Sequence, residues 1–220
     1  MKKLIVVSCS AHSKPTLLEK SLKNIPGNIE LKIIRDNKRS INEVYNEIIN
    51  STSLGDNDAV LFVHDDVYIN CSDLINRLST NFKTFDVVGL AGSVSANIKE
   101  PALWHLMSDK KDHRGAVAHA VSKDGMEPYH ITAFGPMPAR ALLIDGLFIA
   151  VKSSVLKSVQ FDISNPSRFH YYDLDFSLQC NKNKFKIGVC DIPVVHMSPG
   201  LTKVDKEWED GQQWFLNKWR

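Results

Sequence analysis

The feature that most constrains the fold is a series of short apolar runs, each of strand length and without strict alternation of apolar and polar residues. Runs of this kind are typical of strands that are covered on both faces. They lie at residues 3–8, 30–34, 59–63, 86–92, 141–151 and 185–195. Helical patterns separate the first three runs, so the order of elements predicts an α/β fold with a mainly parallel central sheet flanked by helices.

The two helical patterns extend from Pro15 to Asn24 and from Ile41 to Asn50. Ser40 and Glu43 have the spacing of a capping box at the start of the second helix. In an open α/β sheet, ligands bind outside the carboxyl ends of the strands. Functional side chains are therefore expected where the apolar runs end.

Composition narrows the classes of function. The 220 residues are 43% hydrophobic, which is enough for one large domain over 1–220. Lys plus Arg number 27 against 25 Asp plus Glu, and a net charge of +2 argues against a nucleic-acid partner. Residues 4–7 are too short an apolar run for an export signal, and the four cysteines have no CxxC spacing. We therefore expect a cytoplasmic protein with free thiols.

Residues 93–140 interrupt the regular order of elements and show no clear period. This segment contains four histidines, His105, His113, His119 and His130. An insertion of this length on a compact domain is typically functional or mobile.

The run at 59–63 ends in His64, Asp65 and Asp66. Mg²⁺ and Mn²⁺ prefer oxygen ligands and commonly take one or two carboxylates together with substrate phosphates. A cation site is one interpretation of this triplet. In the other, the two aspartates begin a turn and cap a helix near Ser72.

Two further groups of polar side chains follow the same pattern. Asp173 and Asp175 open a helical segment, where carboxylates are also favoured by the helix dipole alone. His196 ends the last apolar run, just before a Pro-Gly break. It is interpreted either as a turn or core histidine or as a metal ligand.

Taken in order, "HDD" (64–66), "YDLDF" (172–176) and "DIPVVH" (191–196) resemble motifs of the GT-A glycosyltransferases, particularly the bacterial family 2-like branch. The resemblance extends from the first strand to about Gly200, and the insertion fits it least. It implies a GT-A, nucleotide-diphospho-sugar transferase fold that uses Mn²⁺ or Mg²⁺. It also implies a sugar-nucleotide donor, with a UDP-sugar favoured, and a glycan or lipid-linked acceptor in polysaccharide biosynthesis.

The same resemblance assigns roles to individual residues. It implies that Asp66 and His196 hold the cation, with His64 in place of the first aspartate of the family's DxD motif. It implies that Asp173 is the general base of an inverting transfer, with Asp175 as the alternative. Asp65 or His64 is expected to assist at the donor's diphosphate.

The remaining candidates come from two other segments of the resemblance. "IDGLFIAVKSSVL" (144–156) resembles the strand that lines the sugar site, which nominates Asp145 and Gly146. "DNKRSINEVYNEII" (36–49) resembles the segment that faces the base and ribose. The nucleotide-binding candidates are Ser8, Asp36 and Asn46.

Two other functions stay open. Clusters of His and Asp with a metal also form phosphoester hydrolases, which cleave without a sugar acceptor. A non-catalytic module would bind sugar nucleotides or glycans without turnover. A dinucleotide enzyme is disfavoured because no GxGxxG follows the first strand.

The aromatic tail, about 201–220, places Trp208, Phe215 and Trp219 on one side of a predicted helix. The favoured interpretation is a helix packed on the catalytic domain. The alternative is an interfacial anchor, in which the tail makes peripheral contact with the inner face of a membrane that carries a lipid-linked acceptor.

Overall fold

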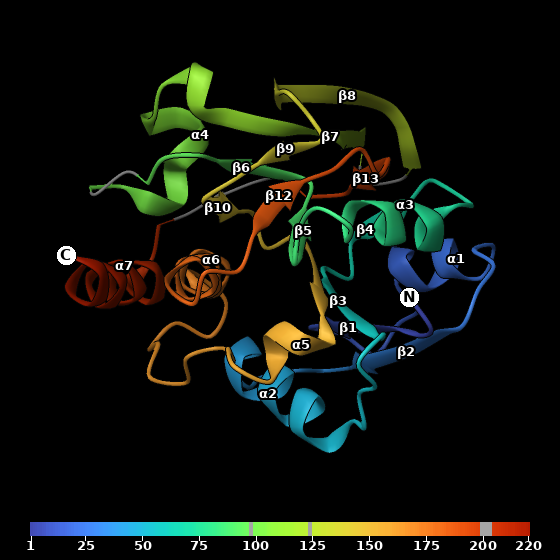
Figure 1. Ribbon diagram of the computed structural model, residues 1–220. Coiled ribbons are helices and arrows are strands. Elements are labelled where there is room, and N and C mark those ends of the chain that lie inside the picture. The colour runs from blue at the N-terminus through green and yellow to red at the C-terminus, as the bar shows by residue number, and fades with distance from the viewer. Residues whose placement is uncertain (97–98, 123–124, 199–203) are drawn as a thin grey trace.

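The computed structural model describes residues 1–96, 99–122, 125–198 and 204–220. They form two sheets with helices packed around them (Figure 1). The larger sheet contains, in spatial order, β2 (Ile29–Ile34), β1 (Leu4–Cys9), β3 (Ala59–Val63), β11 (Phe148–Lys152), β5 (Val87–Gly89), β12 (Ile187–Val189) and β9 (Ala139–Arg140).

The second sheet lies beside the first. Its strands are, in spatial order, β10 (Leu143–Ile144), β6 (Ala91–Ser93), β7 (His113–Ser122), β13 (Val194–His196) and β4 (Val67–Ile69). β8 (Gly125–Gly135) pairs with β7 as an antiparallel hairpin.

The α/β prediction is confirmed, and the larger sheet is mixed rather than purely parallel. β1 is parallel to β2 and β3, and β12 is parallel to β5. β11 runs antiparallel to both of its neighbours, β3 and β5. It enters from the second sheet through a short turn at Asp145–Leu147 and not through a crossover helix, so its direction is reversed.

Three apolar runs predicted as single strands are each divided between the two sheets. Run 86–92 forms β5 and β6, run 141–151 forms β10 and β11, and run 185–195 forms β12 and β13. Both halves of each run are buried, so apolar continuity alone does not reveal the bend. The candidates Asp145 and Gly146 lie at one of these passages, between β10 and β11.

The helices are α1 (Leu17–Leu22), α2 (Ile41–Ser51), α3 (Leu74–Asn81), α4 (Trp104–Met107), α5 (Ser153–Leu156), α6 (Tyr172–Lys182) and α7 (Lys206–Trp219), with 3₁₀ turns at Pro101–Leu103 and Lys110–Asp112. Both helices expected between the first strands are present. Ser40 caps α2 by accepting a hydrogen bond from the Asn42 amide, not from Glu43. The reciprocal capping box is instead formed by Thr16 and Glu19 at α1.

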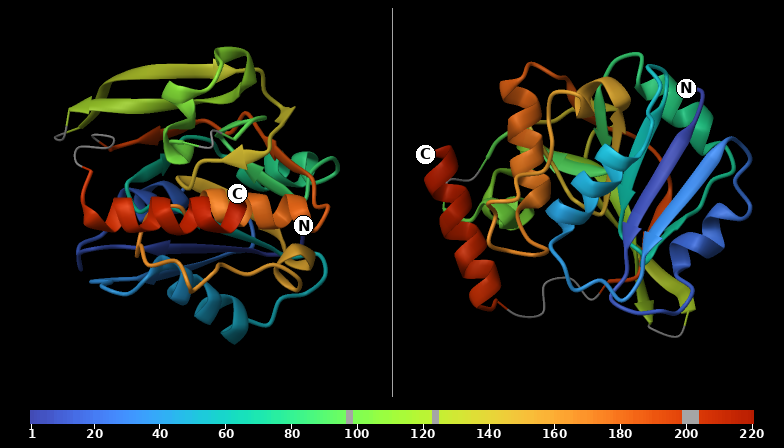
Figure 2. Two further views of the ribbon diagram at one scale, coloured as in Figure 1. Left: turned by 90° about the vertical axis from the view of Figure 1, so that its left-hand side faces the viewer. Right: turned by 90° about the horizontal axis from the view of Figure 1, so that it is seen from below.

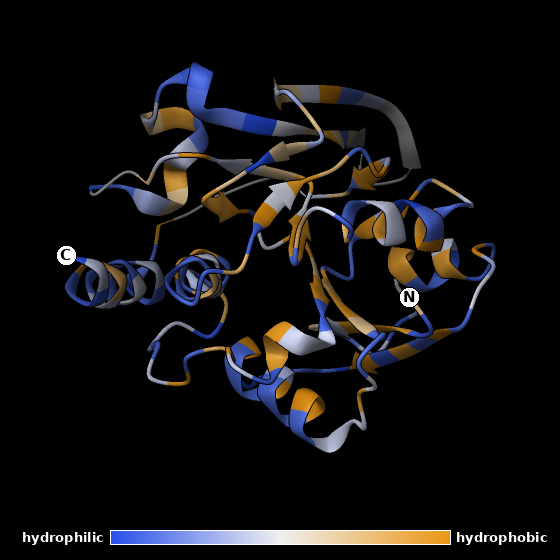
Figure 3. Cartoon of the chain, in the orientation of Figure 1, coloured by the Kyte–Doolittle hydropathy of each residue, from blue (hydrophilic) through white to orange (hydrophobic). Residues whose placement is uncertain are grey.

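Apolar side chains fill both faces of the larger sheet. In β1, Leu4 and Val6 join the core that contains α1 and α3. Ile5 and Val7 point to the opposite face and join the core that contains α2, α5 and α6. Figure 3 colours the central strands β3, β5 and β12 mostly as hydrophobic. The two-sided burial predicted from the sequence is therefore observed.

The insertion at 93–140 is more regular than its sequence indicates. It contains α4, both 3₁₀ turns and the β7–β8 hairpin, which forms one end of the molecule in Figure 2. Residues 97–98 and 123–124 of this predicted insertion lie outside the described residues.

The predicted C-terminal helix is α7, and it runs beside α6 (Figures 1 and 2). Trp208 and Phe215 are buried and Trp219 is half-buried, so the shared aromatic face packs on the domain. The aromatic face of α7 is therefore covered by the rest of the chain. Residues 201–203 of the predicted tail, and the Pro-Gly break before them, lie outside the described residues. No described helix is long and apolar enough to span a membrane.

Candidate active site

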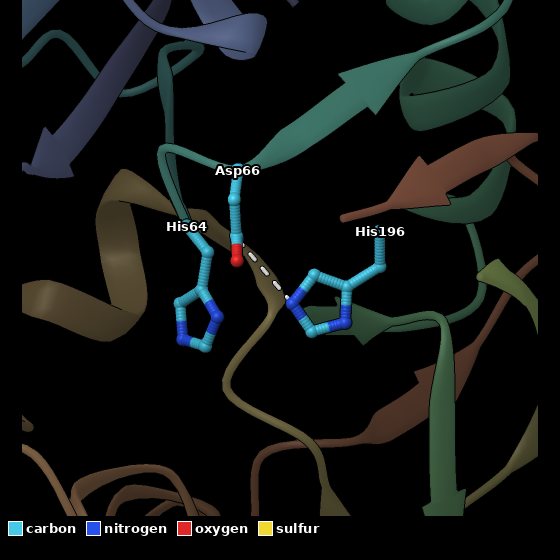
Figure 4. Close-up of side chains that lie close together, drawn as sticks. All are labelled: His64, Asp66 and His196. Carbon is cyan, nitrogen blue, oxygen red and sulfur yellow. Dashed lines mark ion pairs between the residues drawn. The ribbon is translucent and has the colours of Figure 1, made fainter. Parts of the chain in front are cut away.

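Three predicted residues, His64, Asp66 and His196, meet where the two sheets adjoin (Figure 4). His64 and Asp66 follow β3, and His196 ends β13. Pairing of β13 with β4 sets His196 opposite Val67, and the Met197 amide donates to the Asp66 carbonyl at 2.9 Å. One ligand atom from each of the three side chains lies within 4.8 Å of the others. The structure thus brings together three residues that the sequence analysis singled out at separate strand ends.

Two buried atoms of this cluster form an ion pair but no hydrogen bond among the described residues. Asp66 Oδ1 lies 3.3 Å from His196 Nε2. Both atoms are buried, and neither has a hydrogen bond of good geometry within the described part of the chain. Buried polar atoms are normally satisfied, so such a pair indicates a site for a further group. One carboxylate and two imidazoles suit a divalent transition metal such as Mn²⁺.

The pKa values in the cluster reflect burial and mutual charge. Burial, only partly offset by the Asp66 carboxylate, lowers the pKa of His64, so its imidazole is neutral near pH 7. Burial alone would raise the pKa of Asp66, but the adjacent imidazoles of His196 and His64 outweigh it and lower that pKa. Conversely, burial acts to lower the pKa of His196, and Asp66 raises it above its usual value. A cation must therefore displace a proton from His196 when that imidazole is charged.

A second group surrounds the turn between β10 and β11. Asp173, in the first turn of α6, accepts a hydrogen bond of 2.7 Å from the Gly146 amide. Burial, followed by the neighbouring Asp145 carboxylate, raises the pKa of Asp173 to about 7. A carboxylate with a pKa in this range can take up a proton near neutral pH.

Asp175 lies apart from this group. Its side chain is 1% exposed and contacts Lys218 at 2.7 Å, Trp219 Nε1 at 2.8 Å and Gln179 at 2.7 Å. Two residues along a helix correspond to a rotation of about 200°, which turns Asp175 away from Asp173. Its contacts attach α7 to α6.

A cavity of about 340 Å³ opens beside the carboxyl ends of β1 and β2. Its lining includes Ser10, Lys38, Arg39, Asp65, Arg168 and Phe169. A smaller cavity of about 70 Å³ shares Asp65 and Phe169 with it and is also lined by His64 and Asp66. The shared lining places the larger cavity, which carries three basic residues together with Asp65 and Glu207, next to the cation cluster.

The three nucleotide-binding candidates do not line either cavity. Ser8 is fully buried in β1, and Asp36 lies in an exposed turn with a φ of 50°. The Asn46 side chain bonds to the backbone of Phe161 through both its oxygen, at 3.0 Å, and its nitrogen, at 2.7 Å. Its contacts support the loop that precedes α6.

The basic and aromatic lining of the large cavity was not predicted. Lys38 and Arg39 come two and three residues after Asp36, so the basic pair after the second strand was an available signal. Arg168 and Phe169 come from a loop distant in sequence, and no local pattern marks them. Glu207 of α7 accepts hydrogen bonds from the Arg168 amide at 2.6 Å and from its guanidinium at 3.1 Å. This ion pair fixes one wall of the cavity to α7.

Comparison with known protein families identifies the family to which the chain belongs. Residues 15–219 match the model of a family described as a glycosyltransferase-like family. No curated protein matches the chain significantly.

Two solved structures share the fold at low identity. A197 from STIV gives a TM-score of 0.51 at 12% identity, covering 92% of this chain and 98% of A197. The mannosyltransferase PcManGT from Pyrobaculum calidifontis, in complex with GDP-Man and Mn²⁺, gives 0.50 at 11% identity. That match covers 90% of this chain and 58% of PcManGT. Because the family match covers nearly the whole chain, the protein belongs to the glycosyltransferase-like family and has the GT-A type of fold.

Proposed function

We propose that the protein transfers a sugar from a nucleotide-diphosphate donor to a hydroxyl group of a glycan or lipid-linked acceptor, with the help of a divalent cation. The observation that carries this proposal is the buried ion pair of Asp66 Oδ1 and His196 Nε2 beside the cavity, in which neither atom has a hydrogen bond among the described residues. Two buried atoms that attract cations, next to a cavity lined by Lys38, Arg39 and Arg168, match the needs of a metal–diphosphate complex.

The donor would lie along the two connected cavities. Lys38, Arg39 and Arg168 supply positive charge for its phosphates, and Phe169 offers an aromatic face. Asp66, His196 and His64 would hold the cation, which when bound stabilises the charge that develops on the departing diphosphate. Two imidazoles in the ligand set favour Mn²⁺ over Mg²⁺. The UDP-sugar donor remains a prediction from the sequence.

Asp173 would act as the general base. The Gly146 amide orients its carboxylate, and its pKa of about 7 suits removal of a proton from an incoming hydroxyl. Attack by that hydroxyl on the anomeric carbon, opposite the leaving diphosphate, inverts the configuration at that carbon. Asp145 and Gly146 lie beside Asp173, where the sugar is expected.

The test is a screen of UDP- and GDP-sugars with Mn²⁺ and a panel of glycan acceptors. We expect acceptor-dependent transfer, its loss in excess chelator, and a product of inverted anomeric configuration by NMR. Asp66→Asn should remove most of the activity, whereas Asp191→Asn, at an exposed position just after β12, should not. Full activity in excess chelator refutes the metal mechanism.

Two results would replace the proposal. Cleavage of a phosphodiester without an acceptor would favour the hydrolase. Donor binding without turnover on the whole acceptor panel would favour the binding module.

A further inference from the structure

The phenol of Tyr172 has no role in the proposed reaction, yet it lies between the cation cluster and the group around Asp173. Tyr172 is 4% exposed and is the first residue of α6. Its hydroxyl donates a hydrogen bond of 2.9 Å to the Gly146 carbonyl. The same oxygen lies 3.1 Å from Nε2 of His64.

The direction of these two bonds follows from counting protons. A carbonyl oxygen only accepts, so the single hydroxyl proton of Tyr172 is directed to Gly146. The Tyr172 oxygen can then only accept from His64, which requires a proton on Nε2 of that imidazole. In the neutral ring, Nδ1 therefore carries the lone pair.

The Nδ1 lone pair of His64 points toward Asp66 and His196. Figure 4 shows one ring nitrogen of His64 turned toward Asp66 and His196 and the other turned away. Since Nε2 is bonded to Tyr172, the nitrogen on the cluster side is Nδ1. Ligating histidines commonly use one nitrogen for the metal while the other donates to a fixed partner.

We propose that Tyr172 is a positioning residue, which holds His64 in the Nε2–H tautomer and so directs its Nδ1 lone pair at the cation shared with Asp66 and His196. This inference rests on the cation site of the proposed function. It adds a requirement beyond the presence of the three ligands: the Tyr172 hydroxyl must be present for His64 to act as a ligand.

The same contacts connect the cation cluster to the base. Gly146 accepts from Tyr172 through its carbonyl and donates to Asp173 through its amide. A Cβ at Gly146 would collide with the Tyr172 hydroxyl, so glycine is needed for this approach. Tyr172 and Asp173, which are adjacent in α6, therefore bond to the carbonyl and the amide of Gly146. These contacts fix His64 relative to Asp173.

The first experiment reads the tautomer directly. Long-range ¹H–¹⁵N correlation spectra of the metal-free protein at pH 8 should show His64 protonated on Nε2. Tyr172→Phe removes only the hydroxyl and should give a mixture of tautomers. Tyr171→Phe is the matched control, because the buried Tyr171 hydroxyl has no hydrogen-bond partner among the described residues. An Nδ1–H tautomer of His64 in the unmodified protein overturns the proposal, whether or not the variant folds.

The second experiment measures binding of Co²⁺ alone, followed by its visible absorption. Loss of such a supporting contact typically weakens metal binding by about 10–100-fold, and we expect this for Tyr172→Phe but not for Tyr171→Phe. Equal affinity in Tyr172→Phe and the unmodified protein overturns the role of Tyr172 and leaves the cation site intact. Absence of Co²⁺ binding to the unmodified protein overturns the cation site and this proposal with it.

Discussion

Replacement of Asp173 by asparagine should stabilise the protein while it removes activity. The pKa of this carboxyl rises from its ordinary 3.8 to about 7 in the fold, because of burial and then of the Asp145 carboxylate. A raised carboxyl pKa means that the folded state holds the proton more tightly than the unfolded state. Stability is therefore lost as the pH rises from about 4 to 7. Asparagine cannot ionise and avoids that loss.

The magnitude follows from the two pKa values. Their difference, at about 1.4 kcal/mol per pKa unit, gives an upper bound of about 4 kcal/mol. Asp173 is only half-buried, and solvent screening reduces the expected gain to about 2 kcal/mol at pH 8. For a chain of this length, such a gain raises the melting temperature by roughly 4–8 °C. At pH 4 the carboxyl is protonated in the fold, so most of the gain should vanish.

The assay is thermal and urea unfolding of both metal-free proteins at pH 4 and pH 8, together with turnover and donor binding. Turnover should fall about 10²–10⁴-fold, the usual effect of losing a general base, while donor binding survives. A variant less stable than the wild type at pH 8, or a stability difference that does not change with pH, refutes the electrostatic argument. Undiminished glycosylation refutes the assignment of Asp173 as the base.

Two further predictions concern α7 and the cavity wall. Lys218→Met should lower the unfolding free energy by about 3–5 kcal/mol in urea titrations, because Lys218 is the cationic partner of the buried Asp175. Lys206→Met, in an exposed pair with Asp210, should cause no measurable change, and equal effects of the two would contradict this view of Asp175. Arg168→Ala should weaken sugar-nucleotide binding about 10–100-fold in calorimetry, as expected for loss of a hydrogen bond to a charged group. Arg77→Ala on α3 is its control, and unchanged binding in Arg168→Ala would exclude this wall from the donor site.

The sequence predicted best those features that depend on local pattern. The run at 59–63 is buried on both faces, and this predicted both a strand and the position of Asp66 at its end. The aromatic spacing in the tail likewise predicted which face of α7 is covered.

Features that depend on distant contacts were not predicted. β7 and β8 are strands because they pair with each other and with the second sheet, although their own sequence has no clear period. Arg168 lines the cavity because Glu207 holds it there, and the two residues are distant in the chain. Asp173 and Asp175 look equivalent in the sequence, and only the packing of α7 separates them. The same local sequence pattern fits both aspartates, whereas the contacts of the two side chains in the fold differ.

The division of strands between two sheets has a consequence for biosynthesis. Asp66 and His196 meet because the chain returns to the same place after 130 further residues, the difference between their positions. At about 5–20 residues per second, a ribosome needs roughly 7–26 s to pass from one to the other. Throughout that interval the emerging polypeptide holds two of the three ligands and lacks the third. A nascent chain therefore lacks the complete set of three ligands until His196 has been synthesised.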